Sequence, residues 1–284
     1  MISFDFLRKL FFHTRHKGLE GFKKFISLNS FEKKIFSSKK LIWNDKGFWQ
    51  IDPLPAKDEL TRYYSEIYWF NNSSYREILV TKRDLNHYLF LKNQLGKNFS
   101  QIKNFLNFGA GHGGISYLLS IGGTNVINIE PSDIYSPNVN NFHTFANLNA
   151  LDQAKIVNNK KFNFVYSSHV LEHLNNPLDF FVEIFGIMNN DGLLFIEVPN
   201  CRRIVEDNYT NGGCNGKKDG SHLIYFTKDF FERFTDKVFF IGGTYDDPGD
   251  ALDNEDYANF LRVLISKEEI KSFLKRENLL ISKS

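Results

Sequence analysis

Cysteine is scarce in this chain of 284 residues. Its two cysteines, Cys201 and Cys214, do not form a Cys-x-x-Cys pair, so the sequence offers neither the sulfur ligands of a zinc finger nor a disulfide framework. We expect free thiols rather than a disulfide between the two, and a cytoplasmic location for the protein.

Long hydrophobic runs are also missing. The first twelve residues are apolar, but Asp5, Arg8 and Lys9 interrupt them, so they do not form the continuous core of a signal peptide. No later run approaches the length of a membrane span. We therefore expect neither secretion nor a membrane span. Because 42% of the residues are hydrophobic, the chain can still bury an ample core as a soluble globular protein.

Charge is nearly balanced overall, with a net charge of +2, but it is distributed unevenly. Residues 1–40 carry ten Lys and Arg against three Asp and Glu, which leaves the other 244 residues at −5. The spacing of Phe4, Leu7, Leu10 and Phe11 predicts an amphipathic helix in this basic segment. Such a helix could lie on anionic lipid or on nucleic acid. We favour packing on the domain or in a homodimer, and expect no nucleic-acid partner.

A glycine-rich turn is the most informative local feature. Residues 104–114, NFLNFGAGHGG, read as a buried strand that ends in Gly109, Gly111 and Gly113, and an apolar helical run follows. This arrangement places a helix N-terminus at a crevice, and glycine lets a ligand approach the bare backbone. The next predicted strand ends on Glu130, whose carboxylate could bind both hydroxyls of a ribose. The segment therefore predicts a pocket for an adenosine-type cofactor.

The glycines alone leave the cofactor open. The spacing of Gly109, Gly111 and Gly114 satisfies the dinucleotide fingerprint, whereas Gly109, Gly111 and Gly113 satisfy a looser methyltransferase pattern. Glu130 lies 21 residues beyond Gly109, close to where a dinucleotide site also has its acid. An NAD(P)-dependent oxidoreductase and a non-catalytic scaffold with the same fold thus remain alternatives at this point.

The region from 162 to 200 is more specific. FNFVYSSHVLEHL at 162–174 predicts a strand that ends at His169, and a helix follows over 178–188. A turn then leads into a second strand at 193–198, which continues into Pro199 and Asn200. This run resembles the class I S-adenosylmethionine-dependent methyltransferases, in the small-molecule branch whose fourth strand ends in His-Val-Leu-Glu-His-Leu and whose fifth ends in Glu-Val-Pro-Asn. The resemblance covers roughly residues 100–240.

The resemblance implies an α/β fold with a Rossmann-like, seven-stranded, mostly parallel sheet, helices on both faces and an antiparallel last strand. The alternation of apolar runs predicts strands at 104–108, 125–130, 142–146, 162–168, 193–198, 237–241 and 258–265. Residues 1–81 are expected to form an N-terminal appendage with a basic helix, a hairpin and an aromatic lid segment. Residues 82–284 would form the cofactor domain, with a substrate loop at 201–227. In the resembled family Tyr68 would fold over the cofactor, and aromatic packing beneath a lid is the alternative for this segment.

Two histidines are candidate catalytic residues. Methyl transfer requires the acceptor and the methyl carbon to be held in line, and a hydroxyl acceptor also has to lose a proton, for which histidine is suited. His169 follows the fourth strand, where ligands bind in open α/β sheets. His222 lies in a His-Leu-x-x-Phe-Thr segment that borders the acceptor site in the resembled branch. Either could instead be structural. His173 could share the face of His169, and Glu172 is expected to order the turn.

The acceptor and any metal are less well determined. By analogy we favour a small molecule, such as a sugar or surface-glycan precursor, and transfer to oxygen. Methylation of nucleic acid is a weaker option, since the Pro-containing motif of amino-methylating DNA enzymes follows the fourth strand, where this chain has Ser-Ser-His-Val. An acidic run at 245–257 lacks the spacing of a calcium loop and reads as a solvated loop. We therefore expect no metal site.

Overall fold

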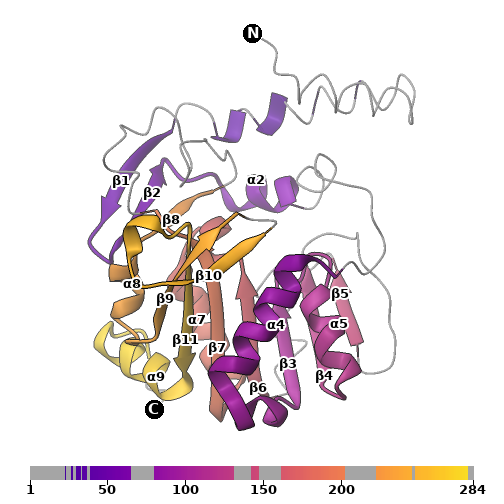
Figure 1. Ribbon diagram of the computed structural model, residues 1–284. Helices are drawn as coiled ribbons and strands as arrows, with labels where there is room; N and C mark the ends of the chain where they lie inside the picture. Colours follow the sequence, from indigo (N-terminus) through magenta and orange to yellow (C-terminus); the bar gives the residue numbers. More distant parts are fainter. Residues whose placement is uncertain are drawn as a thin grey trace.

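The computed structural model describes residues 39–64, 80–130, 161–201, 222–244 and 247–280, the backbone of 142–146 and a few positions between 23 and 36. Its main sheet has eight strands in the order β10-β9-β11-β7-β6-β3-β4-β5 (Figure 1). In chain order these are β3 (Asn104–Phe108), β4 (Asn125–Glu130), β5 (Phe142–Ala146), β6 (Phe162–Ser168), β7 (Met188–Pro199), β9 (Val238–Gly243), β10 (Pro248–Leu252) and β11 (Phe260–Ser266).

The central strands are parallel and the last one is antiparallel. β3 pairs in parallel with β4 and β6, β4 pairs with β5, and β6 pairs with β7. β11 runs antiparallel to both β7 and β9. Continuous apolar runs produce this arrangement because parallel strands are buried on both faces. The predicted Rossmann-like sheet of seven strands is thus confirmed, with β10 as an additional edge strand.

β10 corrects the interpretation of the acidic run as a loop, although its Asp250, Asp253 and Asp256 are exposed to solvent as predicted. Its backbone pairs with β9, whose last residue, Gly243, has a φ of 82° and lies opposite Pro248. Its sequence, PGDAL, contains residue types that are depleted in strands, so propensity gave no signal. The acidic Asp247 beside it forms an ion pair with Lys82 at 2.9 Å. Pairing with a neighbouring strand therefore decided the structure here.

Helices cover both faces of the sheet (Figure 1). α4 (Lys82–Leu95) and α5 (Gly114–Ile121) contribute to one buried cluster, and α7 (Pro177–Ile187), α8 (Lys228–Glu232) and α9 (Lys267–Arg276) contribute to another. The sequence sets their starts: Thr81 caps α4, Asn176 caps α7 ahead of a first-turn proline, and Ser266 caps α9. The cap at Asn176 places the start of α7 one residue before the predicted 178.

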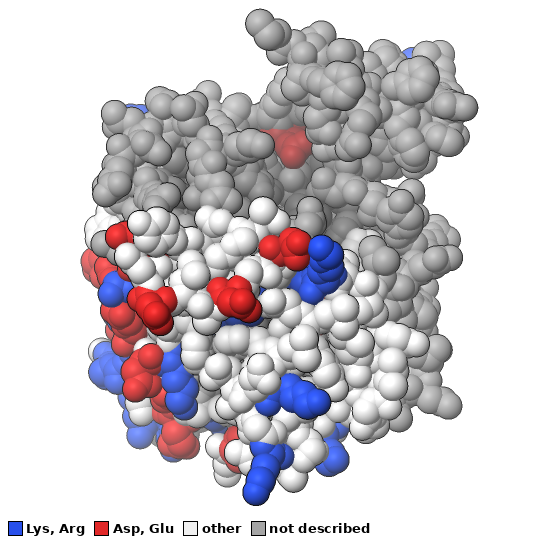
Figure 2. Space-filling model, in the orientation of Figure 1, with Lys and Arg blue, Asp and Glu red and all other residues white. Residues whose placement is uncertain are grey.

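The described surface mixes charges of both signs. On the face drawn in Figure 2, acidic and basic side chains are interspersed rather than gathered into one area of either sign. Among the described residues, no helix combines the length and the apolar character that crossing a membrane would need. Cys201 is disulfide-bonded, whereas the sequence favoured free thiols, and the chain's second cysteine lies outside the described residues.

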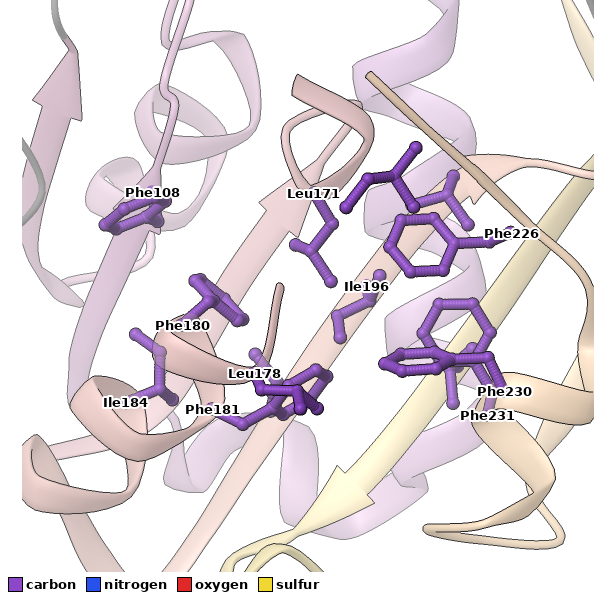
Figure 3. Packing of buried hydrophobic residues seen from close by; sticks show 14 of the residues in the cluster. Phe108, Leu171, Leu178, Phe180, Phe181, Ile184, Ile196, Phe226, Phe230 and Phe231 are labelled. Carbon is purple, nitrogen blue, oxygen red and sulfur yellow. The ribbon is translucent and has the colours of Figure 1, made fainter. Parts of the chain in front are cut away.

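Phenylalanine fills the larger core cluster. Phe181 of α7 faces Phe230 of α8, with ring centroids 6.1 Å apart, and Phe180, Phe231 and Ile196 of β7 belong to the same cluster (Figure 3). All of these side chains are at most 3% exposed. Aromatic rings bury large areas and favour edge contacts, which accounts for many of the 30 phenylalanines in the sequence. The packing fixes the helices behind the segment that follows β6.

A small antiparallel sheet packs against the main domain. It consists of β1 (Lys40–Asn44), β2 (Phe48–Asp52) and β8 (Ile224–Phe226), in that order. The predicted hairpin is therefore present, α2 (Lys57–Arg62) follows it, and the end of the predicted substrate loop 201–227 is a strand rather than a loop. β8 forms because its three buried residues pair with β2. Residues 202–221, most of 1–38 and the lid segment 65–79 lie outside the described residues.

Candidate active site

The glycine turn after β3 has the backbone that the sequence predicted. Gly109, Gly111 and Gly113 have φ angles of 73°, 50° and 65°, which is the left-handed region that glycine adopts without strain. The amides of Gly109 and Ala110 both donate to the carbonyl of Ile129, at 2.8 and 2.9 Å. These bonds tie the turn to the end of β4.

Gly109 also allows a close approach by the segment after β6. A Cβ at this position would lie 2.2 Å from Cγ2 of Val170, a distance that no side chain could accept. Val170 stands between His169 and Leu171, so the turn and the predicted catalytic segment touch each other. Because Gly109 has no side chain, the predicted cofactor turn can contact the predicted acceptor region directly.

Glu130 lies where a ribose-binding acid is expected. It is the last residue of β4, is 3% exposed, and its Oε2 accepts a hydrogen bond from the Gly111 amide at 2.8 Å. The acid and the bare backbone therefore meet at the carboxyl edge of two parallel strands. This arrangement fits the adenosyl group of a cofactor, with Glu130 beside the sugar and the glycines beside the tail. Tyr68 lies outside the described residues, so its predicted role stays a prediction.

A buried polar chain holds helix α5 on the strands below it. Ser116 is fully buried, accepts a hydrogen bond from Asn107 Nδ2 at 2.8 Å and donates one to Asn128 Oδ1 at 2.5 Å. At the start of the same helix, the Ile115 amide donates to Asp84 of α4 at 3.0 Å. Buried polar groups that satisfy one another specify a unique packing. The chain therefore fixes where the first turn of α5 faces the glycines.

His169 follows β6 directly and adopts an unusual backbone conformation. Its φ is 54°, a left-handed value that a non-glycine residue adopts at a cost of about 1–3 kcal/mol. Its amide donates to the carbonyl of Glu197 at 2.8 Å. Its ring lies between two acids, with Nδ1 3.1 Å from Glu172 Oε1 and Nε2 3.4 Å from Glu197 Oε1. Strain of this kind is typical of functional positions.

Glu172 lies close to His169 and to two further histidines, His173 and His222. Glu172 and His173 belong to a single helical turn, η3 (Leu171–His173), and His222 comes just before β8. The Leu223 amide donates to the Glu172 carbonyl at 2.7 Å and so holds the two segments together. His222 Nε2 lies 3.9 Å from Glu172 Oε1, and the rings of His173 and His222 are 4.9 Å apart. His169 and His222, the two predicted catalytic residues, thus approach the same carboxylate.

The carboxylate of Glu172 is buried and poorly satisfied. It is 1% exposed, and neither of its oxygens accepts a hydrogen bond from any described residue. Burial raises the pKa of Glu172, although His173 and His222 oppose that shift. Tyr64 packs beside this group, with its ring 5.6 Å from that of His173. The sequence predicted only that Glu172 orders the turn.

Sequence reasoning missed a second buried acid. Glu197 of β7 accepts hydrogen bonds from Arg83 Nη2 at 3.0 Å, from His87 Nε2 at 2.8 Å and from Arg262 Nε. Burial acts to raise the pKa of Glu197, but His87, Arg83 and Arg262 outweigh it and hold the pKa well below its usual range. An acid inside an apolar strand was the available signal, because such a charge needs partners.

His87 completes that network through both of its ring nitrogens. Burial lowers the pKa of His87 in spite of the neighbouring Glu197. Burial raises the pKa of Tyr166, so its hydroxyl keeps its proton and donates to His87 Nδ1 at 2.5 Å. The network joins α4 to β6, β7 and β11 beneath His169. It supports the site from below.

The Val-Pro-Asn motif after β7 has a structural role of its own. Asn200 is buried, and its Nδ2 donates to the carbonyls of Ala258 at 3.2 Å and Glu255 at 3.4 Å. These bonds hold the start of β11 against the end of β7. They account for Asn200 without any contact to a nucleic-acid base.

Comparisons with known proteins identify the family of this chain. A family model described as a methyltransferase domain matches residues 80–237, more than half of the chain. No curated protein matches the chain significantly. Among solved structures, a SAM-dependent methyltransferase from Thermotoga maritima shares 13% identity with a TM-score of 0.41, and the match covers 66% of this chain and 97% of that one. An O-methyltransferase family protein from Burkholderia thailandensis shares 12% with a TM-score of 0.42, and the match covers 65% and 56%. The match over residues 80–237 shows that this chain belongs to the methyltransferase-domain family, as a class I enzyme with S-adenosylmethionine as its cofactor.

Proposed function

We propose that the enzyme methylates a small molecule in the cytoplasm, at a hydroxyl oxygen, with a sugar or surface-glycan precursor as the favoured class. The observation that carries this proposal is the meeting of His169 and His222 at Glu172, next to the glycine turn. Val170 packs on Gly109, so an acceptor held by the histidines would lie close to a cofactor held by the turn. A hydroxyl is the acceptor that benefits most from nearby groups that remove a proton.

The cofactor side would be formed by Gly109, Gly111, Gly113 and Glu130. S-adenosylmethionine supplies an electrophilic methyl carbon when bound. Glu130 would accept hydrogen bonds from the ribose hydroxyls, while the three glycines would let the tail lie on the backbone. We propose that Tyr68 covers this region and excludes water. The buried charge network under His169 would keep the acceptor side rigid, which in-line transfer requires.

The acceptor side would be formed by His169 and His222, and either could take the hydroxyl proton. Both ring nitrogens of His169 lie near carboxylates, of Glu172 and of Glu197, and these acids would stabilise the charge of a protonated ring. The side chain of His222 is 12% exposed and that of His169 is 9% exposed. Both side chains are thus largely buried but keep some exposure to solvent.

Calorimetric titration tests the cofactor half of the proposal. The untagged protein should bind S-adenosylhomocysteine with micromolar affinity and should not bind NAD. Glu130→Gln should weaken that binding by about tenfold, since it removes a charge-assisted bond to the ribose, and Gly111→Arg should abolish it. Binding of NAD alone would reject the assignment in favour of an oxidoreductase.

A panel of acceptors tests the catalytic half. Consumption of the methyl donor should be measured with nucleotide sugars and small phosphorylated metabolites that carry free hydroxyls, and with amine analogues of the same compounds. Turnover of hydroxyl acceptors that falls at least about tenfold in His222→Asn or His169→Asn would support the proposal. Turnover of the amines alone would refute transfer to oxygen, and an enzyme that binds cofactor without any turnover would favour the scaffold alternative.

We also propose that the basic residues 1–40 mediate a homodimer rather than binding nucleic acid. The interspersed charges on the face in Figure 2 offer no continuous basic surface on its described part. Light scattering of the full chain and of a chain starting at residue 30, which keeps the buried Ile35 and Phe36, should show a dimer only for the former. Salt-dependent binding of DNA or RNA by the full chain would contradict this proposal.

A further inference from the structure

Three side chains of the acceptor region could meet on one metal ion. Glu172, His173 and His222 each offer one ligand atom, and these atoms all lie within 4.8 Å of one another. They come from the turn after β6 and from the residue that precedes Leu223 and β8, which the hydrogen bond between Leu223 and Glu172 holds together. The cluster therefore rests on two fixed segments of the chain.

We propose that Glu172, His173 and His222 bind one divalent transition-metal ion and that this ion activates the acceptor hydroxyl. The binding site stands on the geometry of these residues alone. Its catalytic role rests on the proposed transfer to oxygen. The sequence predicted no metal here, because His169, Glu172 and His173 read as a turn and His222 lies 49 residues beyond His173.

The state of Glu172 is the second observation that points to a ligand. A buried carboxylate normally accepts hydrogen bonds, because leaving it unsatisfied is costly. Neither oxygen of Glu172 accepts a hydrogen bond from the described residues. The nearby Glu197, by contrast, accepts hydrogen bonds from three side chains. A cation between Glu172 and the two histidines would satisfy the carboxylate oxygens that no hydrogen bond satisfies.

The donor set indicates which metals fit. Two imidazoles and one carboxylate suit Zn²⁺, Fe²⁺, Mn²⁺ or Co²⁺ better than Mg²⁺ or Ca²⁺, which favour oxygen ligands. Ligand atoms at 2.0–2.2 Å from one ion lie about 3.4 Å apart in a tetrahedron. The observed limit of 4.8 Å thus calls for closure by roughly 1.4 Å at most, which small side-chain rotations provide. Three protein ligands leave a position for a substrate oxygen, as in catalytic zinc sites.

His169 would position the carboxylate rather than bind the ion. Its Nδ1 lies 3.1 Å from Glu172 Oε1, close enough to hold one oxygen while the other turns to the metal. Groups that orient a ligand in this way usually change metal affinity by about 10–100-fold when they are removed. The inference therefore gives His169 and His222 different functions, the first in positioning and the second in coordination.

The ion would make the acceptor a better nucleophile. Coordination lowers the pKa of a bound hydroxyl, so the acceptor loses its proton to water. The lone pair of its oxygen then forms a bond to the methyl carbon, the bond between that carbon and sulfur breaks, and the electron pair stays on sulfur as a neutral thioether. No oxidant or reductant is required.

Metal titration of the untagged full-length protein tests the site directly. After treatment with a chelator and its removal, Co²⁺ should bind one ion per chain with visible ligand-field absorption, and Zn²⁺ should displace it. Glu172→Gln and His222→Asn should each weaken binding by about 100-fold, and His169→Asn by about tenfold. The matched control is the double variant His13→Asn and His16→Asn, which removes a His-x-x-His pair of the N-terminal sequence and should leave binding unchanged.

Each outcome distinguishes the site from the proposed function. Affinity for S-adenosylhomocysteine should be the same in Glu172→Gln and the native chain, which shows that the variant is folded; if Glu172→Gln does not fold, His222→Asn serves instead. Failure to bind Co²⁺, or binding that only the control variant loses, would overturn the metal site whatever the methylation assays show. If Co²⁺ binds the native protein at one ion per chain but the native and Glu172→Gln enzymes methylate the acceptor equally fast, the metal site stands and its catalytic role is overturned.

Discussion

Replacing Glu197 with glutamine should strongly destabilise the protein. The change keeps the shape of the side chain but removes the one negative charge that Arg83, His87 and Arg262 share. Arg262 is 1% exposed, so its charge stays buried after the substitution. Removing one partner of a buried ion pair costs about 3–5 kcal/mol, because the remaining charge is left uncompensated.

Thermal unfolding followed by circular dichroism at neutral pH measures this cost. At about 2–4 °C per kcal/mol for a chain of this size class, the midpoint should fall by about 6–20 °C. The matched control is Glu232→Gln, the same chemical change in an exposed pair with Lys228. Surface pairs contribute at most about 1 kcal/mol, so the control should shift the midpoint by about 4 °C or less.

A double substitution tests whether the loss of stability in Glu197→Gln comes from the uncompensated charge of Arg262. If Arg262 is the charge left uncompensated, Glu197→Gln combined with Arg262→Gln should cost less than the sum of the two single changes. Equal midpoint shifts for Glu197→Gln and Glu232→Gln would refute the reasoning, because they would mean that the buried acid contributes no more than an exposed one.

Three further predictions follow from single contacts. Gly109→Ala should lose about 1–3 kcal/mol of stability and most of the affinity for S-adenosylhomocysteine, because the new Cβ would overlap Val170. The matched control is Gly186→Ala in helix α7, where a Cβ meets nothing within 4 Å. This control should gain about 0.5–1 kcal/mol of stability. Ser116→Ala should cost about 1–3 kcal/mol in denaturant unfolding, since it removes the hydrogen bonds that Ser116 makes with two buried asparagines. The folded-state pKa of Glu197 is held below its ordinary value of 4.5. The stability that the ionised carboxylate contributes is therefore complete above that pH and is lost as the pH falls through the lower folded-state pKa. The difference in unfolding midpoint between the native protein and Glu197→Gln should accordingly shrink below about pH 4.5.

The fold was largely predictable because its signals are local. The strands at 104–108, 125–130, 142–146 and 162–168 have the predicted bounds, since each is a short run that ends in glycine, proline or a polar residue. β7 begins at Met188, before the predicted 193, because the asparagines and glycine at its start pair only through a bulge against β6. β10 was not predicted, because only its neighbour makes it a strand.

The candidate site was predictable only in part, for a related reason. The glycines and Glu130 lie within 21 residues of one another, and their chemistry can be recognised from spacing. The partners of Glu197 lie 114, 110 and 65 residues away, so no local pattern connects them. His222 was found through a family resemblance, whereas its approach to Glu172 depends on how β8 pairs with β2.

The two buried acids near His169 differ in how far neighbouring positive groups compensate their charge, and this difference distinguishes a structural acid from a candidate ligand. Glu197 and Glu172 are equally buried, at 1% exposure each, and His169 lies close to both. The protein surrounds Glu197 with positive charge and lowers its pKa, whereas burial prevails at Glu172 and raises its pKa. A compensated acid holds elements together, but an acid that the fold leaves uncompensated lowers stability unless something else binds it. The fold retains this acid at the carboxyl edge of the sheet, where ligands bind, and this position is the physical reason to look for a cation at Glu172 and not at Glu197.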